Sequence, residues 1–145
     1  MINLLIDTSV LVKWFHAEGE SELIPARALR TAHLAGDVEA MVIDLAYYEV
    51  GNVLTHVLKW PATDVADQLD DLRAILGEPV AMTASWFRPA TEVAQTHQLS
   101  FYDASWAAAA AELGISLISA DRRLVNAGLA ESATTTVARL RLPTR

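Results

Sequence analysis

The chain has 145 residues, a formal charge of −7, 52% hydrophobic residues and no cysteine. This length and hydrophobic content predict a single domain over residues 1–145 and exclude a disordered chain. The lack of cysteine excludes disulfide scaffolds, zinc–thiolate sites, iron–sulfur clusters and thiol enzymes. No apolar run approaches about 20 residues, and no basic leader precedes the first one. We therefore expect no membrane span, no secretion signal and a cytoplasmic location.

Short apolar runs alternate with longer segments of helical spacing along the chain. The predicted strands are 2–6, 40–43, 79–82, 115–118 and 135–138. The predicted helices are 9–16, 21–34, 45–58, 62–76, 86–97 and 103–113, with Gly36, Gly77 and Gly114 as stop signals. This alternation predicts an α/β fold, a three-layer α/β/α sandwich with a mostly parallel sheet of four to five strands and helices on both faces.

Four acidic residues are predicted to lie at the carboxyl edge of this sheet, where open α/β folds form their binding sites. Asp7 directly follows the first strand, and Asp121 follows the strand at 115–118. Asp103 begins a helix, and Glu49 lies one turn into the helix after the second strand. Parallel strands end on the same side, and the helices that follow them begin there. The four carboxylates can therefore converge.

Each acid also has a purely structural interpretation. Asp7 and Asp121 can cap the helices that follow them. Asp103 can complete a capping box with Ser100, because Ser-x-x-Asp before an apolar helix is typical of that motif. Glu49 falls outside the apolar face of its helix and can be a solvated position. Taken one at a time, these acids do not require a binding site.

The combination of four acids favours a metal site. Close carboxylates repel by about 4 kcal/mol per pair at an effective dielectric constant of about 20. A cluster of them therefore needs cations or raised pKa values. Without cysteine and without paired histidine spacing, the available ligands are hard oxygen atoms, which select Mg²⁺ or Mn²⁺.

Three segments carry a resemblance that spans almost the whole chain. They are LLIDTSVLVKWF at 4–15, YYEVGNVL at 47–54 and LSFYDASWAAAAAELGISLISADRRL at 99–124. In this order they resemble a PIN domain, specifically the VapC-type toxin ribonucleases of bacterial type II toxin–antitoxin (VapBC) systems. An apolar strand followed by Asp-Thr-Ser is a weak motif alone. The Tyr-Asp-Ala helix joined to a strand ending in Ser-Ala-Asp is more specific.

The resemblance implies a catalytic quartet of acids that binds one or two Mg²⁺ or Mn²⁺ ions. Its members are Asp7, Glu49, Asp103 and Asp121. Ser9 and Ser119 match positions where the family places a hydroxyl near the metal or the phosphate. The chain departs from the family at two places. Ser119 replaces a more usual threonine, and Arg122-Arg123 occupies a stretch where some relatives carry a further acid.

Several other residues near these acids have two interpretations. Lys13, Arg122 and Arg123 are the basic residues nearest to them in sequence and can hold phosphates beside the site. Arg122 and Arg123 can equally neutralise carboxylates or lie on a solvated helix face. The four tryptophans are predicted to pack in the core or an interface rather than to stack on bases. We expect one of Tyr47 and Tyr48 to face the cleft and the other to pack inward.

The function that the resemblance implies is a Mg²⁺- or Mn²⁺-dependent endoribonuclease toxin that hydrolyses RNA phosphodiester bonds, in tRNA or rRNA. The resemblance also implies a homodimer, a cognate VapB-type antitoxin, a toxin–antitoxin hetero-oligomer and no membrane partner. The alternative is a non-catalytic metal-binding or regulatory protein-interaction module. A receiver domain and a haloacid dehalogenase both have less support, because Asp7 has no second acid beside it.

Overall fold

A parallel three-stranded sheet lies at the centre of the fold. The computed structural model describes residues 1–145, with the strands in the order β2-β1-β3. Their bounds are Ile2–Ile6 for β1, Val38–Met41 for β2 and Ser116–Ile118 for β3. Leu4 of β1 pairs with Ala40 of β2 on one side and with Ser116 of β3 on the other. Short apolar strands of this kind are typical of a parallel sheet covered on both faces.

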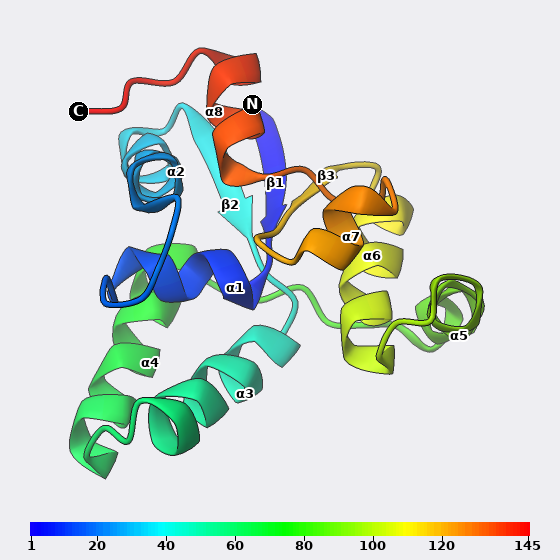
Figure 1. Cartoon of the computed structure of the whole chain (residues 1–145), viewed down its shortest axis with the longest axis horizontal. Helices are drawn as coiled ribbons and strands as arrows, with labels where there is room; N and C mark the ends of the chain where they lie inside the picture. The colour runs from blue at the N-terminus through cyan, green and yellow to red at the C-terminus, as the bar shows by residue number, and fades with distance from the viewer.

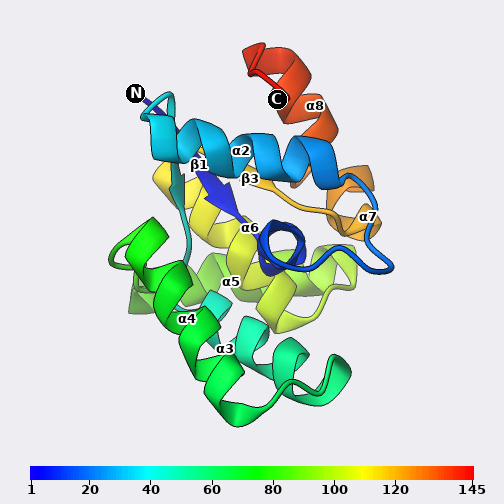
Figure 2. The same ribbon diagram turned by 90° about the vertical axis from the view of Figure 1, so that its left-hand side faces the viewer.

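Helices cover both faces of the sheet (Figure 1). Their bounds are Thr8–Leu11 for α1, Leu23–Ala35 for α2, Leu45–Asn52 for α3, Ala62–Leu76 for α4, Ala84–His97 for α5, Phe101–Leu113 for α6, Arg122–Asn126 for α7 and Ala133–Leu140 for α8. Helix α2 lies in front of the sheet in Figure 2, with α6 behind it. Helix α8 packs against α2, and α5 packs against α6. The predicted α/β class is therefore confirmed. None of these helices is both long and apolar enough to cross a membrane.

Helix α6 packs closely on the sheet because of its small side chains. The run Ala107–Ala110 is buried, and the larger Trp106 beside it is fully buried. Ser100 caps the start of the helix, since its Oγ accepts a hydrogen bond from the backbone N–H of Asp103 at 3.1 Å. Gly114 ends it with a φ of 67°, a left-handed conformation that favours glycine. The cap fixes Asp103 in the first turn, at the same end of the sheet as the end of β1.

Two of the five predicted strands are not strands of this sheet. Segment 79–82 contributes only Val80, whose backbone N–H donates to Val42 O at 2.8 Å in an isolated bridge. Segment 135–138 lies inside α8, where Ser132 Oγ accepts a hydrogen bond from Thr135 N at 3.1 Å. This N-cap outweighs the strand preference of the β-branched residues that follow. The sheet therefore has three strands instead of four or five.

The helix after β2 changes its winding beside the predicted site. Residues Val53–Val57 continue α3 as a π-helical turn. Such turns are rare and occur frequently at functional sites. Asn52 and Val53, at the junction, line the same cleft as Glu49. The predicted helix 45–58 is therefore one continuous element with an irregular second half.

Candidate active site

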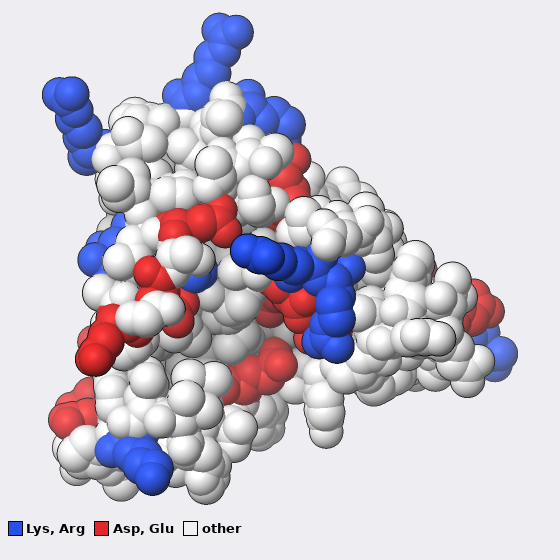
Figure 3. Space-filling model, in the orientation of Figure 1, with Lys and Arg blue, Asp and Glu red and all other residues white.

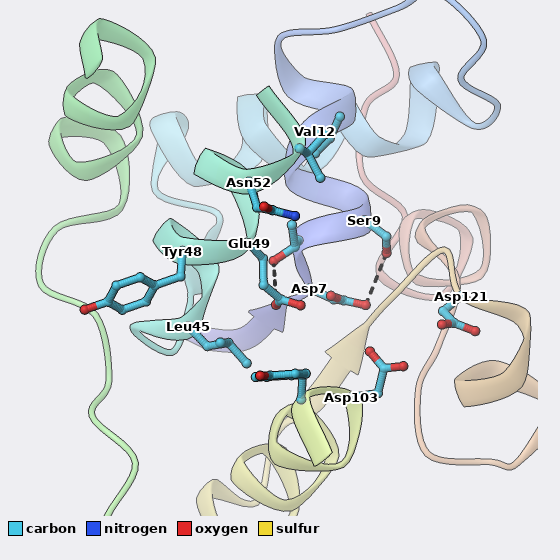
Figure 4. A pocket seen from close by; sticks show the side chains of 12 residues that line it. Asp7, Ser9, Val12, Leu45, Tyr48, Glu49, Asn52, Asp103 and Asp121 are labelled. Carbon is cyan, nitrogen blue, oxygen red and sulfur yellow. Dashed lines mark hydrogen bonds between the residues drawn. The ribbon is translucent and has the colours of Figure 1, made fainter. Parts of the chain in front are cut away.

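A cleft of about 560 Å³ opens beyond the carboxyl end of β1. Four acids line it. They are Asp7 just after β1, Glu49 in α3, Asp103 in α6 and Asp121 just before α7. Figure 4 shows these four carboxylates around one common space. Figure 3 shows acidic side chains around a hollow on this face, with basic side chains over its edge. The topology therefore brings together the four acids singled out from the sequence.

Asp7 is a buried carboxylate that does not cap a helix. Its side chain is only 6% exposed, and it makes no capping hydrogen bond to α1. Its Oδ2 accepts hydrogen bonds from Ser119 Oγ at 2.5 Å and Ser9 Oγ at 3.1 Å. Burial raises the pKa of Asp7 to about 6, and the nearby Glu49 and Asp103 charges add to the rise, while the serine hydrogen bonds oppose it. The capping interpretation therefore does not account for this residue.

The two serines orient Asp7 and join the ends of two strands. Ser9 Oγ accepts a hydrogen bond from the backbone N–H of Ala120 at 2.9 Å. Ser119 Oγ accepts one from the backbone N–H of Asp121 at 3.0 Å. Because each oxygen accepts from the backbone, its hydroxyl hydrogen is available to point at Asp7. Both predicted hydroxyl residues therefore lie at the site, in direct contact with its most buried acid.

Glu49 is held by two side chains that the sequence did not single out as site residues. Its Oε1 accepts hydrogen bonds from Thr8 Oγ1 at 3.0 Å and from Trp106 Nε1 at 2.7 Å. Burial raises the pKa of Glu49, and these hydrogen bonds act in the opposite direction. Trp106 lies three residues after Asp103, which places both on one side of α6. This spacing, and the position of Thr8 beside Asp7, are the signals that point to them.

Asp103 and Asp121 lie on either side of an arginine. Arg123 Nη2 is 3.4 Å from Oδ2 of each carboxylate. Asp121 also caps α7, since its Oδ1 accepts a hydrogen bond from the backbone N–H of Arg123 at 2.9 Å. Burial and the charge of Asp121 raise the pKa of Asp103, while Ser100 and Arg123 oppose the rise. The capping interpretation is therefore correct for Asp121, although its side chain also faces the cleft.

The other basic residues predicted as phosphate contacts lie elsewhere. Lys13 is buried, and its Nζ donates to Glu20 Oε1 at 3.0 Å and to Ser21 O at 2.7 Å. This half-buried ion pair joins the chain after α1 to the loop before α2, outside the cleft. Arg122 lines a separate surface pocket with Ser119. Of the basic residues considered, the structure places Arg123 at the acids instead of Lys13 or Arg122.

The two tyrosines beside Glu49 separate as expected. Tyr48 is exposed and lines the cleft. Tyr47 packs against the core, and its buried hydroxyl has no hydrogen-bond partner. Burial raises the pKa of this hydroxyl. The adjacent positions thus face opposite ways, so Tyr48 is the one available to a bound molecule.

The donor set suits a hard divalent cation, although the carboxylates are not yet gathered around one. Oδ1 of Asp7 and Oε2 of Glu49 accept no hydrogen bond and are available as ligands. Carboxylate oxygens are the ligands that Mg²⁺ and Mn²⁺ prefer. No three Asp, Glu or His side chains are close enough as they stand to hold one ion. We therefore expect the acidic side chains to move closer together when a cation binds.

The chain is similar in sequence to one protein family and in fold to a solved structure. Residues 4–129 match the model of the PIN domain family. A solved structure with a similar fold is that of PAE2754 from Pyrobaculum aerophilum, with a TM-score of 0.67 and 23% sequence identity. The match covers 97% of this chain and 96% of that one. The search of curated proteins gave no significant match. At this identity the solved structure supports the fold, and the family match covers all four acids.

Proposed function

The chain belongs to the PIN domain family, whose members are generally metal-dependent nucleases, and we propose on this premise that it is an endoribonuclease. One observation carries the proposal. Four carboxylates from separate parts of the sequence line a single cleft, and burial raises the pKa of three of them, Asp7, Glu49 and Asp103. Raised pKa values at clustered acids are typical of functional sites. Such a cluster destabilises the fold unless it binds cations.

Each acid has a role in this proposal. Asp7 and Asp103 would hold a Mg²⁺ or Mn²⁺ ion directly, and Asp121 and Glu49 would hold it directly or through water. One or two such ions would supply an activated water and would stabilise the charge that develops on the phosphate. Thr8 and Trp106 fix one oxygen of Glu49, which leaves the other free to accept a proton.

We further propose that the chain is a VapC-type toxin that acts on tRNA or rRNA. Support comes from the three sequence segments that resemble such toxins over most of a 145-residue chain. In this proposal the toxin forms a homodimer, and a VapB-type antitoxin that carries an arginine silences it. The contact of Arg123 with both Asp103 and Asp121 supports that mode of inhibition, because a guanidinium fits between these two carboxylates.

Expression of the chain in bacterial cells tests the endoribonuclease proposal. We expect the wild-type protein to stop growth and to create new RNA 5′ ends at a few positions in tRNA or rRNA. Asp7→Asn removes the charge of the most buried acid and should create none of them. Sequencing of RNA 5′ ends from both cultures measures this. Identical ends in the two cultures, at equal protein levels, would rule out the assigned site.

Arg123→Ala is expected to tighten Mn²⁺ binding by about 2- to 5-fold, the scale expected for an exposed ion pair. The variant removes a cation that contacts two of the proposed ligands, Asp103 and Asp121. Isothermal titration calorimetry of the purified protein with MnCl₂ measures the change. Arg122→Ala is the matched control, since Arg122 makes no ion pair with these acids, and it should bind Mn²⁺ like the wild type. Equal affinities for Arg123→Ala and wild type would show that Arg123 does not compete with the ion.

A further inference from the structure

A second, mostly apolar pocket of about 250 Å³ lies beside the acidic cleft. We call it the aromatic pocket, and its aromatic residues are Tyr48, Phe87, Phe101 and Tyr102. It lies between α3, α5 and α6, which contribute these side chains. Leu45, Tyr48 and Tyr102 line both the aromatic pocket and the acidic cleft. The two spaces therefore share a wall.

The aromatic pocket exposes ring surface that the fold does not use. Tyr48 is 76% exposed and Tyr102 is 62% exposed, and Phe87 and Phe101 are also exposed. The Phe87 and Phe101 rings are stacked, with centroids 5.9 Å apart and an angle of 26° between their planes. Grouped exposed apolar side chains mark binding surfaces more often than single ones do. A flat molecule with apolar faces therefore fits this surface.

We propose that the aromatic pocket binds a nucleobase of the RNA, on a nucleotide next to the phosphate that is cleaved. This inference rests on the proposed nuclease function. A phosphate held at the acids brings its attached bases within one nucleotide of the shared wall. Aromatic side chains that stack on unpaired bases are the common means of binding single-stranded RNA. The pocket therefore positions the substrate and contributes to the choice of cut site.

The polar residues of the pocket favour a base that carries an exocyclic amine. Asp44 is the acidic residue that lines it, and its exposed carboxylate makes no capping hydrogen bond to α3. A carboxylate accepts hydrogen bonds from such an amine, as in protein contacts to cytosine N4. Ser105 also lines the pocket, but its hydroxyl donates to Phe101 O at 2.7 Å. Adenine, guanine or cytosine is thus favoured over uracil.

Cleavage of matched RNA oligonucleotides tests the base-binding role. One oligonucleotide contains the mapped cut site, and in the others one nucleotide next to that site carries ribose without a base. For the wild type we expect one of these abasic changes to lower kcat/KM by about 5-fold or more, the smaller end of base-stacking effects. Phe87→Ala should lower kcat/KM on the intact RNA by a similar factor. It should also cleave the intact and the abasic RNA with equal kcat/KM. Phe87 lines the aromatic pocket and does not line the acidic cleft, so the Phe87→Ala variant should bind Mn²⁺ with wild-type affinity.

Further variants make the outcome specific. Phe87→Leu keeps most of the apolar volume without the ring face, and it replaces Phe87→Ala if that variant folds poorly. Leu34→Ala removes an exposed apolar side chain on α2, away from the pocket, and should keep the wild-type ratio between the RNAs. Asp44→Asn should reduce the preference for amine-bearing bases over uracil, because an amide both donates and accepts.

The results distinguish this inference from the proposed function. If the wild type cleaves the intact and abasic RNAs equally well, the base site is wrong and the nuclease function stands. If it cleaves no RNA, the proposed function fails, and the base site fails with it. Light scattering provides a separate check. A change from dimer to monomer in Phe87→Ala, with the wild-type ratio between the RNAs retained, would assign this surface to an interface between copies instead.

Discussion

Asp7→Asn is expected to stabilise the metal-free fold at pH 7 by about 2 kcal/mol. Burial raises the pKa of Asp7 from 3.8 to about 6, so the folded protein holds this proton more tightly than the unfolded chain. The stability gained from the protonated acid is present below about pH 4 and is lost as the pH rises through about 6. A shift of this size corresponds to about 3 kcal/mol at most. Asparagine keeps an acceptor for Ser9 and Ser119 without a buried charge.

Chemical denaturation between pH 4 and pH 8, with EDTA present, measures this difference. The advantage of Asp7→Asn should be small near pH 4, grow as the pH rises through about 6 and stay level between pH 7 and pH 8. Added Mn²⁺ should raise the stability of the wild type and have less effect on the variant, because a ligand stabilises the state that binds it. Asp37→Asn changes an exposed carboxylate and should stay within about 0.5 kcal/mol of the wild type. A loss of stability in Asp7→Asn at pH 7 would indicate that this carboxylate is structural.

Trp106→Phe is expected to cost about 2 kcal/mol more stability than Trp14→Phe. Both tryptophans are buried, and both substitutions remove the same volume. Trp106 Nε1 donates to Glu49 Oε1 at 2.7 Å, whereas Trp14 Nε1 has no hydrogen-bond partner. A hydrogen bond to a charged group contributes about 1.5 to 3 kcal/mol. The difference between the two variants therefore isolates the contact with Glu49.

The same pair of variants tests whether Trp106 positions Glu49 for the proposed metal site. Denaturation curves give the stability difference, and calorimetry with Mn²⁺ gives the affinity of the folded protein. Trp106→Phe should weaken Mn²⁺ binding, and Trp14→Phe should leave it unchanged. Equal stability losses and equal Mn²⁺ affinities in the two variants would mean that the contact of Trp106 with Glu49 has no role beyond packing.

The sequence predicts the positions of the acids better than it predicts their contacts. Asp7 directly follows β1 and Asp121 lies three residues after the end of β3, so the parallel topology alone brings them to one edge of the sheet. The contact between Trp106 and Glu49 joins residues 57 positions apart, and it depends on where the fold places α6 relative to α3. No local pattern specifies such a distance. The π-helical turn after Asn52 is likewise absent from the hydrophobic periodicity, which predicts one regular helix.

Side-chain direction explains the remaining differences between the sequence prediction and the structure. Lys13 follows the first acid by six positions, but it lies in a 3₁₀ turn and its side chain pairs with Glu20. Arg122 and Arg123 are adjacent in sequence. The Asp121 cap sets where α7 begins, and with this start the side chain of Arg123 points toward the acids. Ser132 similarly decides that 135–138 is helical. Each outcome depends on a single cap or ion pair that composition does not reveal.

Hydrolysis of labelled RNA by the purified protein tests the central claim most directly, namely that the four acids form a metal-dependent nuclease site. Wild-type protein with Mn²⁺ should cut the RNA at defined positions, and EDTA should stop the reaction. Asp7→Asn, confirmed as folded by its denaturation curve, should show no cleavage above background under the same conditions. Cleavage by Asp7→Asn at the wild-type rate, or wild-type cleavage unaffected by EDTA, would contradict the assignment of this site.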